Sequence, residues 1–133
     1  MLALVAASYF SDITLTVAMT PSDFVWQGFM QGNKDGCKEW PIEGESTLSW
    51  HGKPLDYMPF VYKHPDYWKV IEQETKGTGN ILCSRKLFDD SEKAYNLTEK
   101  EMIKVENICG KLCLIGADDD TLWNTGKYIR RMD

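Results

Sequence analysis

The sequence predicts an α+β fold, in which a mixed or antiparallel sheet packs against about three helices. Residues 12–19 alternate apolar and polar side chains, as a half-buried strand does. Other segments carry the capping and periodicity signals of helices. These strands and helices follow one another without the regular β-α-β order that indicates a parallel sheet, which favours the α+β class.

Two strands are expected at the start of the chain. Residues 2–9 form an apolar run that is too short to cross a membrane and lacks the basic residues of a signal peptide, so a buried strand is favoured. This strand either pairs with residues 12–19 across residues 10–12 or forms one longer element with them. The apolar side chains of the second segment would share one face, namely Ile13, Leu15, Val17 and Met19.

A helix is predicted from Pro21 to Gln31. Pro21 suits the first helical position, Asp23 favours the positive end of the helix dipole, and Gly32 suits the left-handed residue that ends a helix. A glycine inside a helix, such as Gly28, costs about 1 kcal/mol relative to alanine. We therefore expect Gly28 to lie in close contact with a neighbouring element.

The next part of the chain is rich in turn residues. Residues 33–45 predict a loop or an edge segment. Strands are expected at Thr47–Trp50 and Leu55–Tyr62, on either side of a turn at residues 51–54. Pro59 limits the second strand to a sheet edge, because proline has no N–H group to donate.

A second helix is expected over residues 64–77, with Pro65 at its first position and Gly77 at its end. Its apolar stripe consists of Tyr67, Val70 and Ile71. Residues 80–84 then predict a short buried strand, and residues 85–97 a polar loop.

A third helix is expected over residues 97–110, because Thr98 and Glu101 have the spacing of a capping box. Either this helix ends at Gly110 and residues 111–116 form a buried strand, which their apolar run favours, or the helix continues through them. Its apolar face would hold Met102, Val105, Ile108 and Cys109.

The C-terminal segment, residues 118–133, leaves two alternatives open. It forms either a hairpin that turns at residues 124–127 or a helix capped by Asp120. The basic pair Arg130 and Arg131 is expected at a helix end or in a solvated tail.

Length and charge restrict the class of function. A chain of 133 residues is expected to form one compact domain over residues 1–133, with no membrane association. Its net charge of -5 disfavours non-specific binding of nucleic acid, which requires a basic surface.

The cysteines match no zinc motif, and no cofactor or metal is expected. Reduced thiols that pack as small apolar side chains are expected instead, in a cytoplasmic protein. For the acidic run at residues 118–120, a solvated turn or a helix cap is favoured over a cation site. The four cysteines are Cys37, Cys83, Cys109 and Cys113.

Residues 50–68 are the main candidate for a binding site, because they hold both histidines and three of the five prolines among six aromatic residues. Aromatic faces can stack on bases while lysines hold phosphate. The same rings could instead pack in the core, where Trp and Tyr are commonly part-buried. The residues expected to bind a ligand are Trp50, His51, Lys53, Tyr57, Tyr62, Lys63, His64, Tyr67 and Trp68.

These observations favour a small, soluble, non-catalytic binding or inhibitory protein, of the kind found among viral or mobile-element accessory factors. Its partner would be a protein or an anionic, nucleotide-like molecule, and homo-oligomers are also considered. The alternative is a small enzyme that acts on a nucleotide-like substrate with His64 as acid or base. No set of catalytic residues is expected, because the sequence contains neither a nucleophile elbow nor an HExxH motif.

Overall fold

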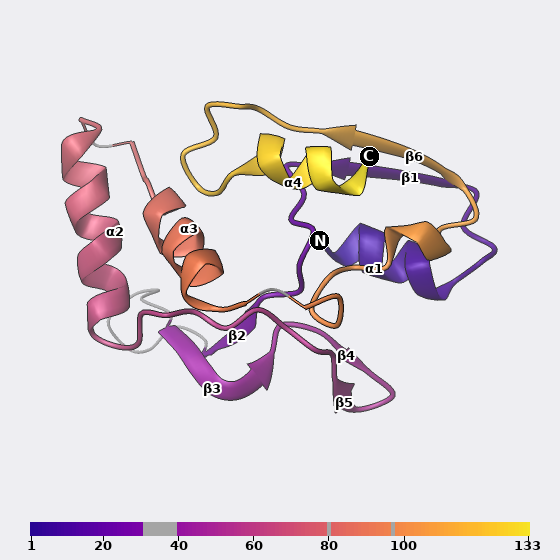
Figure 1. The fold of residues 1–133 in the computed structure, drawn as a ribbon, viewed down its shortest axis with the longest axis horizontal. Coiled ribbons are helices and arrows are strands. Elements are labelled where there is room, and N and C mark those ends of the chain that lie inside the picture. Colours follow the sequence, from indigo (N-terminus) through magenta and orange to yellow (C-terminus); the bar gives the residue numbers. More distant parts are fainter. Residues whose placement is uncertain (31–39, 80, 97) are drawn as a thin grey trace.

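The computed structural model describes residues 1–30, 40–79, 81–96 and 98–133. Over these residues the chain forms four α-helices, one short 3-10 helix and six strands, which pair into three two-stranded sheets (Figure 1). One sheet is parallel and two are antiparallel. The predicted α+β class is therefore confirmed.

The N-terminal segment is a helix, α1 (Leu2–Tyr9), so the prediction of a buried strand over residues 2–9 is wrong. Its sequence is rich in leucine and alanine, which are strong helix formers. An apolar run alone does not distinguish a short buried strand from a helix. The buried side chains of α1 are Leu4, Val5 and Ala7.

The parallel sheet joins β1 (Leu15–Met19) and β6 (Lys111–Ile115). Both strands were predicted, but the predicted burial is inverted. Thr16 and Ala18 are buried, whereas the apolar residues on the other face of β1 are exposed. Alternation shows which side chains share a face, but tertiary packing decides which face meets the core. The strand β6 is likewise only half-buried, and only on its inner face.

The described residues 21–30 are extended, so the helix predicted from Pro21 to Gln31 is wrong; Gln31 itself lies outside the described residues. All side chains from residue 21 to residue 28 are buried, which a surface helix with one polar face would not allow. Phe24 also forms a single strand bridge with Met102. Tertiary contacts thus override the local capping signals.

An antiparallel sheet joins β2 (Gln27–Met30) and β3 (Trp40–Ser46). The strand β3 is consistent with the edge segment predicted for residues 33–45, of which residues 33–39 lie outside the described residues. A β-carbon on Gly28 would lie 3.0 Å from the carbonyl oxygen of Ser46. The close contact predicted for Gly28 is therefore confirmed.

A short hairpin joins β4 (Ser49–Trp50) and β5 (Lys53–Pro54), with a turn at His51 and Gly52. The strand predicted over Leu55–Tyr62 is wrong, because the chain there is irregular apart from one bridge at Met58. Pro54 just before this segment and Pro59 within it have no N–H group to donate, which limits pairing with a neighbouring strand.

The helix α2 (Asp66–Gly77) confirms the helix predicted over residues 64–77, with its end at Gly77 and its buried stripe, but it begins at Asp66, and Pro65 is its N-cap and not its first residue. The described residues 81–84 form no strand, and a helix, α3 (Arg85–Ala94), replaces the loop predicted for residues 85–97. The polar composition hid α3, because the two large apolar side chains on its buried face, Leu87 and Phe88, are outnumbered by six charged ones.

The helix predicted over residues 97–110 is absent from its described part, which contains only a short 3-10 helix, η1 (Val105–Asn107). The Thr98 amide donates to the Glu101 carboxylate at 3.2 Å, as in a capping box. This hydrogen bond closes a turn, however, and no α-helix follows it in the described residues up to Gly110. The last segment forms a helix, α4 (Thr125–Met132), and its cap is Asn124, not Asp120.

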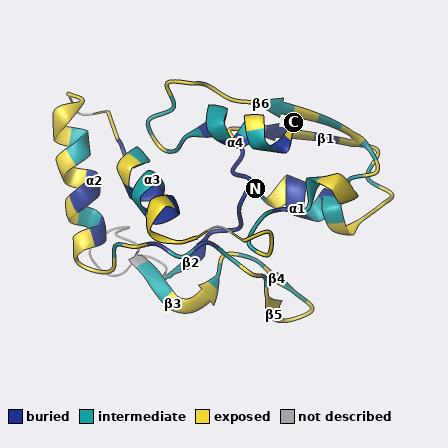
Figure 2. Cartoon of the chain, in the orientation of Figure 1, coloured by how far each residue is buried: buried dark blue, intermediate teal, exposed yellow. Residues whose placement is uncertain are grey.

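The core is an aromatic cluster in which Trp26 stacks on Phe60 and meets Phe88 edge-on, with centroid distances of 5.2 and 4.8 Å. Figure 2 shows the buried residues on the inward sides of α2, α3 and α4. Cys83 is buried, but Cys109 and Cys113 are exposed, so the expectation of buried thiols is wrong for those two. Cys37 lies outside the described residues.

Among the described residues, every helix is too short or too polar to span a lipid bilayer.

Candidate binding groove

The structure divides the predicted ligand-binding residues between two places. Trp50, His51 and Lys53 belong to the β4–β5 hairpin, whereas Tyr67 and Trp68 belong to α2. In Figure 1 the hairpin and α2 lie on different sides of the β2–β3 sheet. Residues 50–68 therefore do not form one continuous aromatic face.

In the hairpin, the ring of Trp50 packs against the end of α1. Its centroid lies 4.8 Å from that of Tyr9 and 5.3 Å from that of Phe10. His51 is exposed and meets the Trp50 ring edge-on at 4.5 Å. Trp50 thus holds the hairpin against the C-terminal end of α1 through its contacts with Tyr9 and Phe10.

Near α2, the predicted residues are engaged within the chain. Tyr62 donates a hydrogen bond to Asp90 at 2.7 Å, and Lys63 forms an exposed ion pair with Glu43 at 2.9 Å. Tyr67 is buried, so its ring has little surface to offer a ligand. His64 and Trp68 lie beside these residues, at the start of α2.

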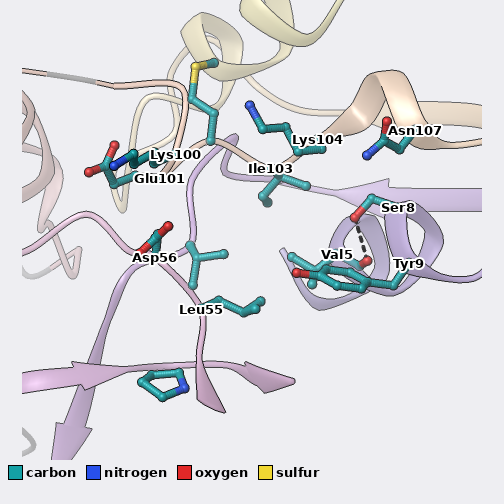
Figure 3. Close-up of a pocket in the computed structure, with 13 residues that line it drawn as sticks. Val5, Ser8, Tyr9, Leu55, Asp56, Lys100, Glu101, Ile103, Lys104 and Asn107 are labelled. Carbon is teal, nitrogen blue, oxygen red and sulfur yellow. Dashed lines mark hydrogen bonds between the residues drawn. The ribbon is translucent and has the colours of Figure 1, made fainter. Parts of the chain in front are cut away.

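A cavity of about 490 Å³ lies between α1, the segment that follows β5, and residues 100–107 (Figure 3). A second cavity of about 300 Å³ adjoins it and shares Glu101 with it. We call the two cavities together the groove. The first is lined by Val5, Ser8, Tyr9, Val25, Pro54, Leu55, Asp56, Lys100, Glu101, Met102, Ile103, Lys104 and Asn107, and the second by Tyr57, Met58, Pro59, Tyr95, Asn96 and Glu101.

Two walls of the groove, residues 54–59 and residues 100–107, are hydrogen-bonded to the extended segment of residues 23–27. On one side the Ile103 amide donates to the Asp23 carbonyl at 2.9 Å, and on the other the Met58 amide donates to the Val25 carbonyl at 2.7 Å. A strand that binds a neighbour on each side holds those neighbours at a fixed separation. The groove is therefore built on a rigid backbone frame.

The groove combines an apolar interior with charges of both signs. Val5, Leu55 and Ile103 contribute its apolar surface, while Lys104 lies on the wall formed by residues 100–107. Figure 3 shows Asp56, Lys100 and Glu101 together at one end, and Ser8, Tyr9 and Asn107 at the other. Apolar surface with a few polar groups at the rim is typical of ligand sites.

Glu101 is the charged residue common to both cavities. Burial raises the pKa of its carboxyl, but hydrogen bonds from the Thr98 hydroxyl and amide outweigh burial and hold the pKa below its ordinary value. Glu101 is thus an anion at neutral pH. Its negative charge disfavours a strongly anionic ligand at this point of the groove.

Several groove residues were missed by sequence reasoning. Lys100 and Lys104 lie in the segment predicted as a helix over residues 97–110, and Tyr9 lies in the segment predicted as a strand over residues 2–9. Neither prediction brings these side chains close to one another. Tyr57 is the predicted ligand-binding residue that lines the groove, and neither histidine lines either of its cavities. The described residues contain no cluster of three or more potential metal ligands.

A scan against protein-family models, a search of curated proteins and a search of solved structures each found no match to this chain. The geometry of the groove is therefore the basis on which a function is inferred.

Proposed function

We propose that the protein is a non-catalytic binding protein that holds an extended segment of a protein partner in the groove. The observation that carries this proposal is the sharing of Glu101 by two adjoining cavities. Two cavities in a row suit a chain with successive side chains, each of which enters one cavity.

The charges of the groove support a peptide more than an anionic small molecule. The two lysines, Lys100 and Lys104, are balanced by Asp56 and Glu101 on the same lining. A site for a nucleotide would need a local excess of positive charge. A peptide with both acidic and basic side chains complements this mixture.

The proposal is tested by selecting binders from a displayed library of short random peptides, using the immobilised protein. The affinity of the best peptide is then measured by fluorescence anisotropy for the wild-type chain and for Lys104→Glu and Asp56→Lys, which reverse one charge on each wall. We expect each variant to weaken binding by about tenfold, or about 1.4 kcal/mol.

The matched control is Lys76→Glu, a charge reversal of an exposed lysine in the last turn of α2. This variant should bind the peptide as the wild-type chain does. A library that yields no binder, or a peptide whose affinity is the same for the groove variants and the control, would contradict the proposal.

A further inference from the structure

The second cavity of the groove combines two aromatic rings with one negative charge. Tyr57 and Tyr95 contribute the rings, and Glu101 is the one charged side chain among the described residues that line this cavity. The face of an aromatic ring carries negative potential and attracts cations. At about 300 Å³, the cavity lies at the lower end of the size range of ligand pockets, which suits a single side chain.

The two tyrosines of this cavity are available to a ligand. Among the described residues, neither makes a ring contact with another aromatic side chain or a hydrogen bond through its hydroxyl. Tyr57 packs partly against the core, which fixes its position, and Tyr95 is 37% exposed. The other four tyrosines of the chain are each engaged, namely Tyr9 with Trp50, Tyr62 with Asp90, Tyr67 with Phe60 and Tyr128 with Phe24.

The carboxylate of Glu101 is held in place and keeps capacity for a further donor. The amide and the hydroxyl of Thr98 both donate to its Oε2 atom, whereas a carboxylate offers about four acceptor positions. Among the described residues, Glu101 forms no ion pair. Lys100 lines only the first cavity, and Lys63 is paired with Glu43 at 2.9 Å. The chain itself therefore supplies no cation to this cavity.

We infer that the second cavity binds a basic side chain, arginine or lysine, of the partner segment, with its cation against the two rings and hydrogen-bonded to Glu101. This inference rests on the proposed function for the identity of the partner. Glu101 lies at the boundary of the two cavities, and Figure 3 shows it beside Asp56 at one end of the first. The neighbouring residue of the segment would then enter the first cavity, where Val5 and Leu55 favour an apolar side chain.

The first test uses small probes and does not depend on a selected peptide. N-acetyl-arginine amide is titrated into the full chain while backbone amide shifts are followed by NMR. N-acetyl-citrulline amide, which has a similar shape without the charge, is the comparison probe. We expect the arginine probe to shift the amides of Tyr57, Tyr95 and Glu101 and to bind at least about tenfold more tightly than the citrulline probe. No response at these amides, or equal binding of the two probes, would overturn the inference.

The variant Glu101→Gln tests the role of the carboxylate, because it removes the charge and keeps an acceptor for Thr98. It should bind the two probes equally and weakly. The matched control is Glu106→Gln, which removes the same charge from an exposed residue that lines neither cavity, and it should keep the preference for arginine. Tyr95→Leu, which removes one ring, should weaken binding of the arginine probe by about threefold. A preference for arginine that survives in Glu101→Gln would also overturn the inference.

The selected peptides separate this inference from the proposed function. They should share a basic residue at one position, and a neutral replacement there should weaken binding by about tenfold for the wild-type chain and by less than about twofold for Glu101→Gln. Peptides that depend on Lys104 and Asp56 but lack such a position would overturn the inference and support the proposed function. A library without binders, together with binding of the arginine probe, would support the cation site and contradict the proposed function.

Discussion

At the residue scale, Asp23 links three parts of the chain through one arginine. Its carboxylate is fully buried and accepts a hydrogen bond from Arg131 of α4 at 2.9 Å. Arg131 also pairs with the buried Glu92 of α3, and Lys127 lies 2.8 Å from the same carboxylate. Two buried carboxylates thus share these two cations, and Arg131 is engaged in the structure instead of lying in a solvated tail.

This arrangement makes stability depend on pH. Burial raises the pKa of Asp23 to about 6, although the hydrogen bond and the charge of Arg131 lower it. The pKa of Asp23 in the folded chain lies above the ordinary value of 3.8, so the folded state holds the proton more tightly than the unfolded state. The stability that the protonated carboxyl contributes is fully present below about pH 4 and is lost as the pH rises through about 6. Ionisation of Asp23 therefore lowers the free energy of unfolding.

We expect Asp23→Asn, which keeps the uncharged shape, to remove this dependence. Between about pH 4 and pH 7 the free energy of unfolding of the wild-type chain should fall by up to about 3 kcal/mol relative to the variant. Urea denaturation of both proteins at each pH measures the difference. A difference that stays constant across this range would show that Asp23 does not titrate in it.

Gly110 is a second residue on which the fold depends, because a side chain there would meet backbone. A β-carbon on Gly110 would lie 2.3 Å from the carbonyl oxygen of Ile13, at the point where β1 and β6 begin to pair. We expect Gly110→Ala to lower the free energy of unfolding by about 2–3 kcal/mol.

The control for this substitution is Gly77→Ala, where a β-carbon has nothing within 4 Å. It should leave stability unchanged or raise it by about 0.5 kcal/mol, since alanine restricts the unfolded chain. Equal thermal unfolding midpoints for the two variants would disprove the close approach at Gly110.

At the scale of elements, the β4–β5 hairpin has a two-residue turn in which His51 and Gly52 have φ angles of 49° and 76°. Two positive φ angles are typical of a type I′ turn, which favours Asn-Gly. We expect His51→Asn to raise the free energy of unfolding by about 0.5 kcal/mol and His51→Val to lower it by about 1 kcal/mol. Urea denaturation of the two variants gives the sign, and the reverse order would contradict the assigned turn.

The helix α2 could be predicted because its signals agree. Its proline and acidic start, its apolar stripe and its terminal glycine all mark the same boundaries, and the stripe is buried as expected. The segment from Pro21 to Gly32 also has helix start and stop signals, but it lacks a polar face, and its described residues 21–30 cross the core instead. Capping residues express a local preference for a helix. A helix forms only where the pattern of apolar side chains also has the helical period.

At the scale of the whole molecule, the groove could not be predicted, because its walls come from segments far apart in the sequence. Residues 54–59 and 100–104 come together around the groove because both bind the extended segment of residues 23–27, one on each side of it. That segment was assigned to a helix, which would have provided no edges for pairing. The aromatic stretch nevertheless contains part of the site, since Tyr57 lines the groove and Trp50 contacts Tyr9.

The most direct test of the groove as a binding site is hydrogen exchange of the chain with and without the selected peptide. Binding in the groove should slow exchange in residues 5–9, 54–59 and 95–107, while exchange in α2 should stay unchanged. Protection confined to residues 62–68 would place the peptide at the start of α2 and would contradict the proposed groove.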